Sequence, residues 1–167
     1  LQDQMAFAKA VCQSDIIPTV YRGQPANILV AVGYGAPLGL TPMQSLQDIS
    51  VINGKPTASA SFIASQVRMA GHKLRVKKDE KALSVTATIV RYDDPDYPIS
   101  VTRDKAWAQQ MGLLNKDNYR KQRLTMLTWR AITAVAREAC PEILSGVQYS
   151  PDELHDLDTN SDVLAEV

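Results

Sequence analysis

Apolar side chains recur every three or four residues in the first part of the chain. This spacing predicts one helix over residues 3–14 and a second over residues 25–39, each with one face on the core. Gly33 and Gly35 weaken the second helix, and we expect close packing of another backbone to explain them. The run Thr41-Pro42-Met43-Gln44 predicts a capping box that begins a short third helix.

The next segment predicts a hairpin, a helix and a sheet. Asn53-Gly54 lies between two short strand-like runs and is a strong hairpin signal, because both residues tolerate positive φ. Small residues with an apolar stripe predict a helix over residues 58–70, which Gly71 ends. From residue 72 the period changes to two, which predicts three antiparallel strands with turns at 79–81 and 93–96. One face of this meander would be apolar, and the other would carry cations and hydroxyls.

The C-terminal half is expected to be helical. Asp104 caps a helix that Gly112 ends, and a longer helix is expected over residues 117–140. The predicted fold class is therefore α+β: helices packed on a small β-hairpin and a three-stranded antiparallel meander, with a long cationic helix near the C-terminus. We expect residues 1–150 to form a single domain and residues 151–167 to form a flexible acidic tail.

Length and composition fit one globular domain. The chain has 167 residues, with 45% hydrophobic and 22% charged residues. No apolar run approaches the ~20 residues of a membrane-spanning helix, and the first residues lack a signal-peptide pattern, so we expect no membrane contact and a cytoplasmic location. Cys12 and Cys140 lie far apart without a C-x-x-C motif, which predicts two buried thiols rather than a zinc site or a disulfide.

Charge is segregated along the chain although the net charge is zero. Residues 55–91 and 103–137 each carry eight Lys or Arg and two acids, whereas residues 138–167 carry eight acids and no Lys or Arg. This asymmetry indicates a polyanion-binding surface followed by an acidic tail, with a merely solvated surface as the alternative.

The predicted long helix carries its cations on one edge. Arg123, Arg130 and Arg137 repeat every seven residues and drift by only about 20° per repeat. Lys116 and Arg120 fall on the same side if the helix extends that far. We expect this edge to face outward, so that replacing Arg130 or Arg137 by Ala would leave stability nearly intact; a plain solvated face is the alternative.

Three aromatic residues lie among these cations. Aromatic rings between Lys and Arg can stack single-stranded bases, each worth ~1–3 kcal/mol. Trp129 lies on the flank of the apolar face and is predicted to be a core residue. Trp107 and Tyr119 could belong equally to the core or to a stacking surface.

Enzymatic motifs are absent from the sequence. It has no phosphate-binding loop, dinucleotide fingerprint, H-E-x-x-H or G-x-S-x-G motif. The acidic cluster at Asp93, Asp94 and Asp96 is interpreted as a solvated turn rather than a metal site. We therefore expect no catalytic activity, no metal and no cofactor. A metal-dependent DNA-processing enzyme and a non-catalytic scaffold protein remain as alternatives.

Several motifs, in order, resemble the phage RecT family of single-strand annealing recombinases. They span about residues 25–155 and comprise LGLTPMQSL at 38–46, ISVINGKP at 49–56, KDNYRK at 116–121, Met126-Leu127, Trp129-Arg130-Ala131, Ala136-Arg137, Cys140-Pro141-Glu142 and GVQYSPDE at 146–153. Arg123 departs from the family pattern, in which we expect a proline near that point.

The resemblance implies ATP-independent binding and annealing of single-stranded DNA during phage recombination in the bacterial host. It also implies homo-oligomers that form rings or helical filaments, an annealed duplex intermediate and a phage exonuclease as partner. At matching positions it points to Lys55, Lys121, Arg130 and Arg137. Together with the charge pattern, the candidate nucleic-acid-binding residues are Lys55, Arg68, Lys73, Arg75, Lys77, Lys105, Trp107, Lys116, Tyr119, Arg120, Lys121, Arg123, Arg130 and Arg137.

Overall fold

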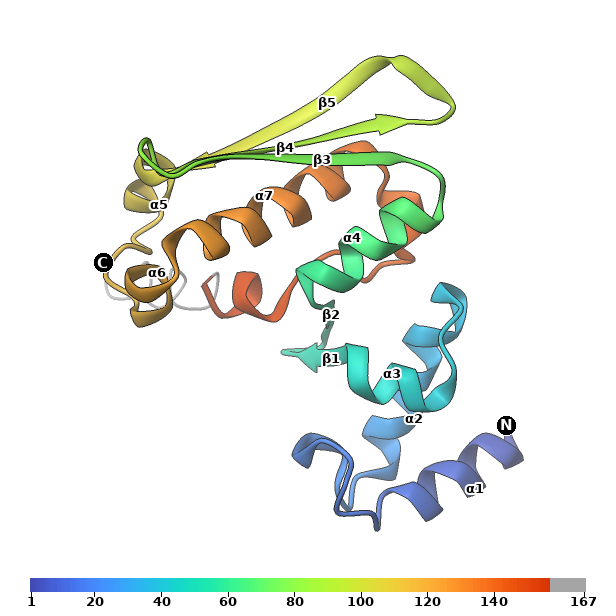
Figure 1. Ribbon diagram of the computed structural model, residues 1–167. Coiled ribbons are helices and arrows are strands. Elements are labelled where there is room, and N and C mark those ends of the chain that lie inside the picture. The colour runs from blue at the N-terminus through green and yellow to red at the C-terminus, as the bar shows by residue number, and fades with distance from the viewer. Residues whose placement is uncertain (157–167) are drawn as a thin grey trace.

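The computed structural model describes residues 1–156 and has the predicted α+β fold (Figure 1). A three-stranded sheet covers one side of the helix α7 (Arg123–Ala139), and α4 (Ala60–Met69) lies against the other side of this sheet-and-helix unit. The N-terminal helices lie at the opposite end of the molecule, beyond the hairpin of β1 (Ile49–Ile52) and β2 (Lys55–Ala58). The hairpin therefore connects the two halves.

The N-terminal half consists of α1 (Gln2–Val11), α2 (Pro25–Gly35) and α3 (Pro42–Asp48). The second helix is shorter than predicted, because the chain tightens into a 3₁₀ turn at Ala36–Leu38. The capping box is confirmed: Thr41 Oγ1 accepts a hydrogen bond from the amide of Gln44, and the amide of Thr41 donates to Gln44 Oε1 at 2.9 Å. This cap begins α3 where the sequence predicted it.

Close packing explains one of the two glycines of α2. A Cβ atom at Gly35 would lie 1.9 Å from Ser45 Oγ and 2.7 Å from Ser45 Cβ. A Cβ atom at Gly33 would meet nothing within 4 Å. The prediction of close packing is therefore confirmed at Gly35, although the neighbour is the Ser45 side chain and not a backbone, and it is wrong at Gly33.

The hairpin turn is formed by Asn53 and Gly54, with φ angles of 51° and 78°. Both values lie in the left-handed region that this turn type requires, so the predicted hairpin is confirmed. The C-terminal segment pairs with the outer edge of β2, where the amide of Ala58 donates a hydrogen bond to the carbonyl of Tyr149 at 3.0 Å.

The meander has the order β3-β4-β5, with β3 at Lys73–Asp79, β4 at Ser84–Arg91 and β5 at Asp94–Asp104. Its inner face is apolar and packs on α7 through buried side chains of Leu74, Val85, Ala87, Ile89 and Val101. The predicted turn at 93–96 is wrong: Arg91 pairs with Asp94, so the turn is Tyr92-Asp93 and the later acids belong to β5. A register shift after Ile89 accompanies this longer strand.

The predicted helix over residues 117–140 is two helices. The chain forms α5 (Lys105–Gln110), α6 (Asp117–Lys121) and then α7, with a break at Gln122, whose φ and ψ are −136° and 51°. Arg120 and the arginines of α7 therefore do not belong to one continuous helix, so the prediction that they lie on the same side of it no longer applies. Because α7 lies between the sheet and other segments, nearly all of its sides are buried.

The C-terminal segment is more ordered than the sequence suggested. After a 3₁₀ turn at Pro141–Leu144, residues 151–156 form a helical turn in which Glu153, Leu154 and Asp156 are buried. The prediction of a flexible tail is therefore wrong for residues 151–156, and its remainder, 157–167, lies outside the described residues. Cys12 and Cys140 are buried free thiols, as predicted, and burial raises the pKa of Cys140 to about 11.

Within residues 1–156, no single helix has the length and apolar character needed to cross a membrane. Taken together, the segments Pro25–Leu38 and Pro42–Asp48 meet that test, but they are bent by 102° relative to each other.

Candidate nucleic-acid interface

The outer face of the meander carries rows of cations and hydroxyls. In one row Arg75 lies opposite Thr88, which lies opposite Ser100; in the next, Lys77 lies opposite Thr86, which lies opposite Thr102. Lys73 extends the cationic column at the start of β3. The predicted polar face of the sheet is confirmed, with Lys73, Arg75 and Lys77 exposed on it.

The hydroxyls of these rows are joined in pairs. Thr88 and Ser100 are hydrogen-bonded at 2.7 Å, and Thr86 and Thr102 at 2.7 Å. Each pair uses one O–H as a donor, so the other O–H remains available to a ligand. Because alternate residues of a strand are separated by about 7 Å, the cations of β3 form an evenly spaced column beside these donors.

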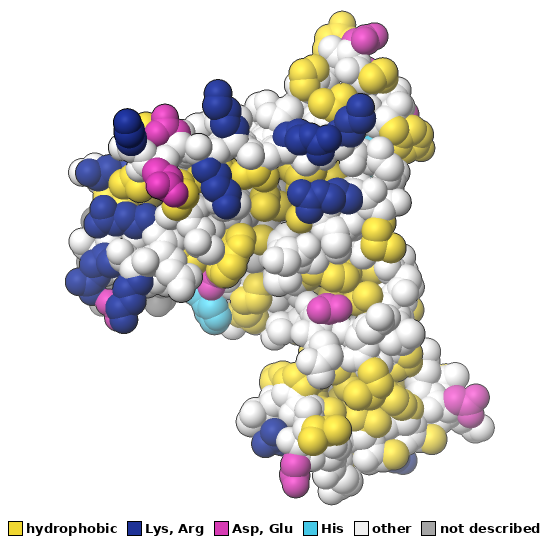
Figure 2. Space-filling view, in the orientation of Figure 1, with side chains coloured by type: hydrophobic (Ala, Val, Ile, Leu, Met, Phe, Trp, Pro, Cys, Tyr) yellow, Lys and Arg dark blue, Asp and Glu magenta, His cyan; other side chains and the backbone are white. Residues whose placement is uncertain are grey.

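A second group of exposed cations lies where the meander meets α5 and α6. The amide of Lys105 donates to the carbonyl of Leu83, which fixes the start of α5 against the β3–β4 turn. Lys105 and Arg123 line the same small depression, and Lys121 lies just before α7. Figure 2 shows Lys and Arg gathered over the sheet and this end of the molecule, with few on the half formed by α1–α3.

Most of these cations have no acidic partner. Of the predicted candidates, the following side chains are exposed and make no ion pair with residues 1–156: Lys55, Arg68, Lys73, Arg75, Lys77, Lys105, Lys121 and Arg123. Two neighbouring acids serve as caps instead, since Asp79 accepts from the amide of Ala82 and Asp104 from that of Trp107. Arg120 is exposed but pairs with Asp117 at 2.5 Å. We call the eight side chains from Lys55 to Arg123 named above, which do not include Arg120, the cationic face.

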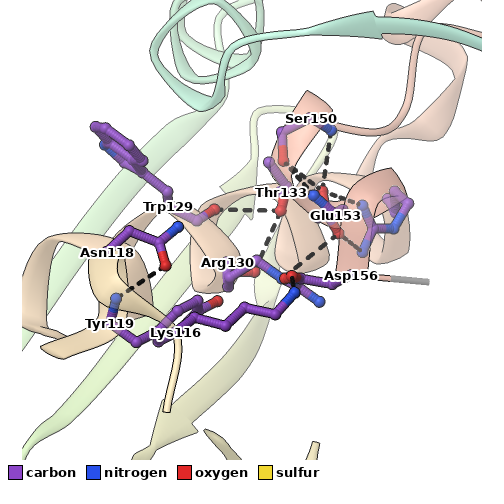
Figure 3. A network of polar contacts seen from close by, with 10 residues as sticks. Lys116, Asn118, Tyr119, Trp129, Arg130, Thr133, Ser150, Glu153 and Asp156 are labelled. Atoms are coloured by element: carbon purple, nitrogen blue, oxygen red, sulfur yellow. Dashed lines mark hydrogen bonds and ion pairs between the residues drawn. The ribbon is translucent and has the colours of Figure 1, made fainter. Parts of the chain in front are cut away.

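Arg130 lies inside the molecule, contrary to the predicted outward edge. It is 7% exposed, and its Nη1 lies 2.5 Å from a carboxylate oxygen of Asp156 (Figure 3). Lys116 pairs with the other oxygen of the same carboxylate. The last described helical turn thus covers this part of α7, which a helical projection of α7 alone does not reveal.

Arg137 is also held by the C-terminal segment. Its guanidinium donates to the carbonyl of Gln148 at 3.1 Å, lies 2.7 Å from a Glu153 carboxylate oxygen, and stands over the Tyr149 ring at 4.6 Å. Burial alone would raise the pKa of Glu153, but the hydrogen bond and charge of Arg137 hold this pKa below its ordinary value. The prediction of an exposed edge is therefore wrong at Arg137 as well, and of the three arginines only Arg123 is exposed.

The three aromatic residues are distributed differently from the prediction. Tyr119 is 1% exposed and belongs to the core, where burial raises its pKa to about 12, so it offers no stacking surface. Trp107 is half-buried, with the guanidinium carbons of Arg103 and Arg130 at 4.8 and 5.1 Å from its ring centre. Trp129 is 37% exposed, so its assignment to the core is wrong.

Arg103 is a central residue that sequence reasoning missed. It follows Ile99 and Val101 on the inner face of β5, and its buried Nε has no hydrogen-bond partner among residues 1–156. Burial, with the nearby charges of Arg130 and Arg137, lowers its pKa. The period-two alternation of β5 was the signal that could have placed it inside.

Lys55 and Arg137 meet at one aromatic ring. The Lys55 Nζ lies 5.9 Å from the centre of the Tyr149 ring, on which Arg137 also stands. Lys55 is exposed at the start of β2, and Arg68 is exposed in the last turn of α4, a few residues before β3. Two members of the cationic face therefore lie on the hairpin and α4, and the other six lie on the meander, α5, α6 and the start of α7.

The acidic turn at the other end of the meander is part of an ion cluster. Arg91 donates to both oxygens of Asp93, to the carbonyl of Ala139 and to Glu142. The hydrogen bond from Arg91 holds the pKa of Asp93 below its ordinary value. In the described part of the chain, no group of three or more His, Cys, Asp or Glu side chains could hold a metal ion.

No protein-family model matches this chain, and a search of curated proteins finds no match either.

Proposed function

We propose that this protein binds single-stranded DNA on its cationic face and promotes the annealing of complementary strands without nucleotide hydrolysis. The observation that supports this most strongly is the set of exposed cations that make no ion pair with residues 1–156, three of which lie beside rows of hydroxyl donors on the outer face of the meander. Phosphate groups are the ligands that such cations and hydroxyls bind in common.

The mechanism would be electrostatic. Lys73, Arg75 and Lys77 hold the sugar-phosphate backbone, and the neighbouring hydroxyls donate to phosphate oxygens. Contacts to phosphates carry no sequence information, so the bases remain free to pair with a second strand. Cations of the same face lower the repulsion between the two strands, and Watson–Crick pairing supplies the specificity.

The motif resemblance extends the proposal to phage recombination. It favours a protein that acts in the cytoplasm of the bacterial host on single strands supplied by a phage exonuclease. One copy covers only a short stretch of strand, on the order of 4–16 nucleotides by analogy with other single-strand binders. We therefore propose that many copies line up head to tail as a ring or a helical filament on the annealed intermediate.

A strand-annealing assay tests this function. Two complementary oligonucleotides, one carrying a fluorophore and the other a quencher, are mixed with the protein in EDTA, and again with ATP and magnesium. We expect accelerated annealing in both conditions. Shortened DNA products that appear only with a divalent metal would support a DNA-processing enzyme instead. Absence of DNA binding at low salt would overturn the proposal in favour of a scaffold protein.

A further inference from the structure

Trp129 forms one wall of a small surface cavity. The cavity has a volume of about 190 Å³ and is lined by Ser59, Ala60, Ser61, Trp129, Ser150, Pro151 and Asp152. Three separate segments supply these residues: the start of α4, the middle of α7 and the start of the last helical turn. We call it the Trp129 pocket.

Trp129 is the only exposed residue of α7 between Met126 and Ala136. The residues that follow it on α7, from 130 to 136, are all buried. The indole points away from the ion cluster of Arg130 and Asp156 (Figure 3), and its N–H makes no hydrogen bond to residues 1–156. A large aromatic side chain left open beside a cavity commonly marks a binding site rather than a core position.

We infer that the Trp129 pocket binds one unstacked base of single-stranded DNA, with the base stacked on the indole. This inference rests on the proposed function and names a subsite of it. Every base presents a flat π-face, so stacking on a tryptophan tolerates any sequence. The small volume suits a single ring system.

The polar lining fits a base and disfavours a phosphate. The carboxylate of Asp152 accepts hydrogen bonds from N–H donors of base edges, such as cytosine N4 or thymine N3, and it repels phosphates. The hydroxyl of Ser59 accepts from the amide of Phe62 at 3.1 Å and keeps its O–H as a donor, and the exposed Ser61 adds a second hydroxyl on the segment opposite Asp152.

The pocket is next to a member of the cationic face. Ser59 directly follows β2, which begins with Lys55, and Ser150 directly follows Tyr149, whose ring lies 5.9 Å from the Lys55 Nζ. The backbone bond between Ala58 and Tyr149 fixes these two walls relative to each other. A strand whose phosphate is bound by Lys55 therefore has the pocket within reach of a neighbouring base.

Tryptophan fluorescence tests the inference directly. The chain has two tryptophans, so a Trp107→Phe variant leaves Trp129 as the only emitter. The variant is titrated with a labelled dT oligonucleotide and with an abasic oligonucleotide of equal length, and anisotropy of the label reports binding. We expect both to bind and only the dT oligonucleotide to quench Trp129. Equal quenching by both, or binding of dT without quenching, overturns the base pocket and leaves the proposed function intact. Failure of both to bind overturns the two together.

Measurements of DNA affinity test the base pocket independently if the Trp107→Phe variant does not fold. Trp129→Ala should lose roughly 5- to 150-fold in affinity for the dT oligonucleotide, the range of one lost stacking contact, whereas Trp129→Phe should keep most of it. Tyr97→Ala, at an exposed aromatic residue of β5, is the matched control and should bind like the parent protein. If Trp129→Ala changes the size of the oligomer but not DNA affinity, the pocket serves protein contacts and the inference is wrong.

Discussion

The carboxylate of Glu153 lies 2.7 Å from Nη2 of Arg137, and the Glu153 side chain is only 2% exposed. The same carboxylate accepts a hydrogen bond from the amide of Ser150. Through this pair the last described segment is attached to α7, so that part of the acidic end of the sequence serves as counter-charge for arginines inside the fold. The side chains of the cationic face, by contrast, make no ion pair with residues 1–156.

Removal of Arg130 should destabilise the protein strongly. Arg130→Ala leaves Asp156, itself 7% exposed on its side chain, with only Lys116 as a cationic partner. Breaking a buried ion pair in this way costs about 3–5 kcal/mol of the free energy of unfolding. Urea denaturation followed by circular dichroism measures the change.

Arg123→Ala is the matched control, because Arg123 lies seven residues earlier on the same helix, is exposed and has no ion pair with residues 1–156. Its effect on the free energy of unfolding should stay within about 0.5 kcal/mol. Equal denaturation midpoints for the Arg130 and Arg123 variants would contradict the buried ion cluster.

Low pH should lower the free energy of unfolding because Glu153 becomes protonated. Its pKa in the folded protein lies below the ordinary value of 4.5, so at pH values between the two the unfolded chain binds more protons. The stabilisation is complete above the unfolded pKa and is lost as the pH falls below about 4.5 and through the folded pKa. Glu153→Gln, which cannot titrate, should show a flatter fall in the free energy of unfolding below that pH than the parent protein.

The control for this pH dependence is Glu80→Gln, in the exposed β3–β4 turn. Asp93 and Glu142 also have lowered pKa values and contribute with the same sign, but they are present in both variants. If Glu153→Gln and Glu80→Gln keep the same acid slope as the parent protein, Glu153 does not carry the effect.

The sequence correctly predicted those elements of the fold that depend only on residues close together in the chain. The Asn53-Gly54 turn, the capping box at Thr41 and the period-two strands from residue 73 depend on the conformational preferences of neighbouring residues. The cations of β3 could be placed on the outer face for the same reason, since strand alternation assigns sides once the apolar side is known.

The position of α7 depends on contacts between distant segments. The heptad of Arg123, Arg130 and Arg137 shows that the three share an edge, but not that residues 148–156 return to cover two of them. A buried arginine requires a partner, and an acidic stretch follows α7 in the sequence. Pairing these two observations could have suggested the cluster, although not which acid meets which arginine.

The cations of β3 should determine the salt dependence of DNA binding. Each phosphate contact with a single strand contributes about 0.7 to the slope of log affinity against log salt concentration. Lys77→Gln should therefore weaken binding of a dT oligonucleotide and make the slope shallower by about 0.7. Fluorescence anisotropy at several salt concentrations measures both quantities.

Lys9→Gln provides the control for this substitution, because Lys9 is exposed on α1, far from the meander (Figure 1). It should leave the slope unchanged. A parent protein whose affinity does not vary with salt, or an equal change of slope in both variants, would contradict phosphate binding at β3.

The two glycines of α2 should respond oppositely to alanine. Gly35→Ala places a Cβ atom 1.9 Å from Ser45 Oγ and should lower the free energy of unfolding by about 1–3 kcal/mol, the usual cost of overpacking. Gly33→Ala meets no atom within 4 Å and should raise it by about 0.4–1 kcal/mol, because the unfolded chain loses freedom. Thermal unfolding of the two variants in parallel checks the pair, and the same sign at both positions would refute the close approach of α3.

Truncation should separate the two parts of the acidic end. A chain that ends at residue 156 keeps Glu153 and Asp156 and should unfold at the same urea concentration as the parent protein. A chain that ends at residue 151 loses both carboxylates, leaves Arg130 and Arg137 without them, and should lose at least the cost of one broken buried pair, about 3–5 kcal/mol. Equal stability of the two truncated chains would mean that these ion pairs contribute nothing.

The longer truncated chain also reports on DNA binding and assembly. Ending the chain at residue 156 removes Asp158, Asp162 and Glu166 and no Lys or Arg, so the net charge rises by three. If these acids compete with DNA for the cationic face, affinity should increase at low salt, and the gain should shrink as salt shortens the screening length from about 30 Å at 0.01 M to about 8 Å at 0.15 M. If they instead link neighbouring copies, light scattering on annealed DNA should show shorter assemblies at unchanged affinity. Because one outcome changes the affinity and the other the assembly size, measuring both on the same truncated chain distinguishes shielding from linkage, and a monomer on annealed DNA in the parent protein would overturn the filament.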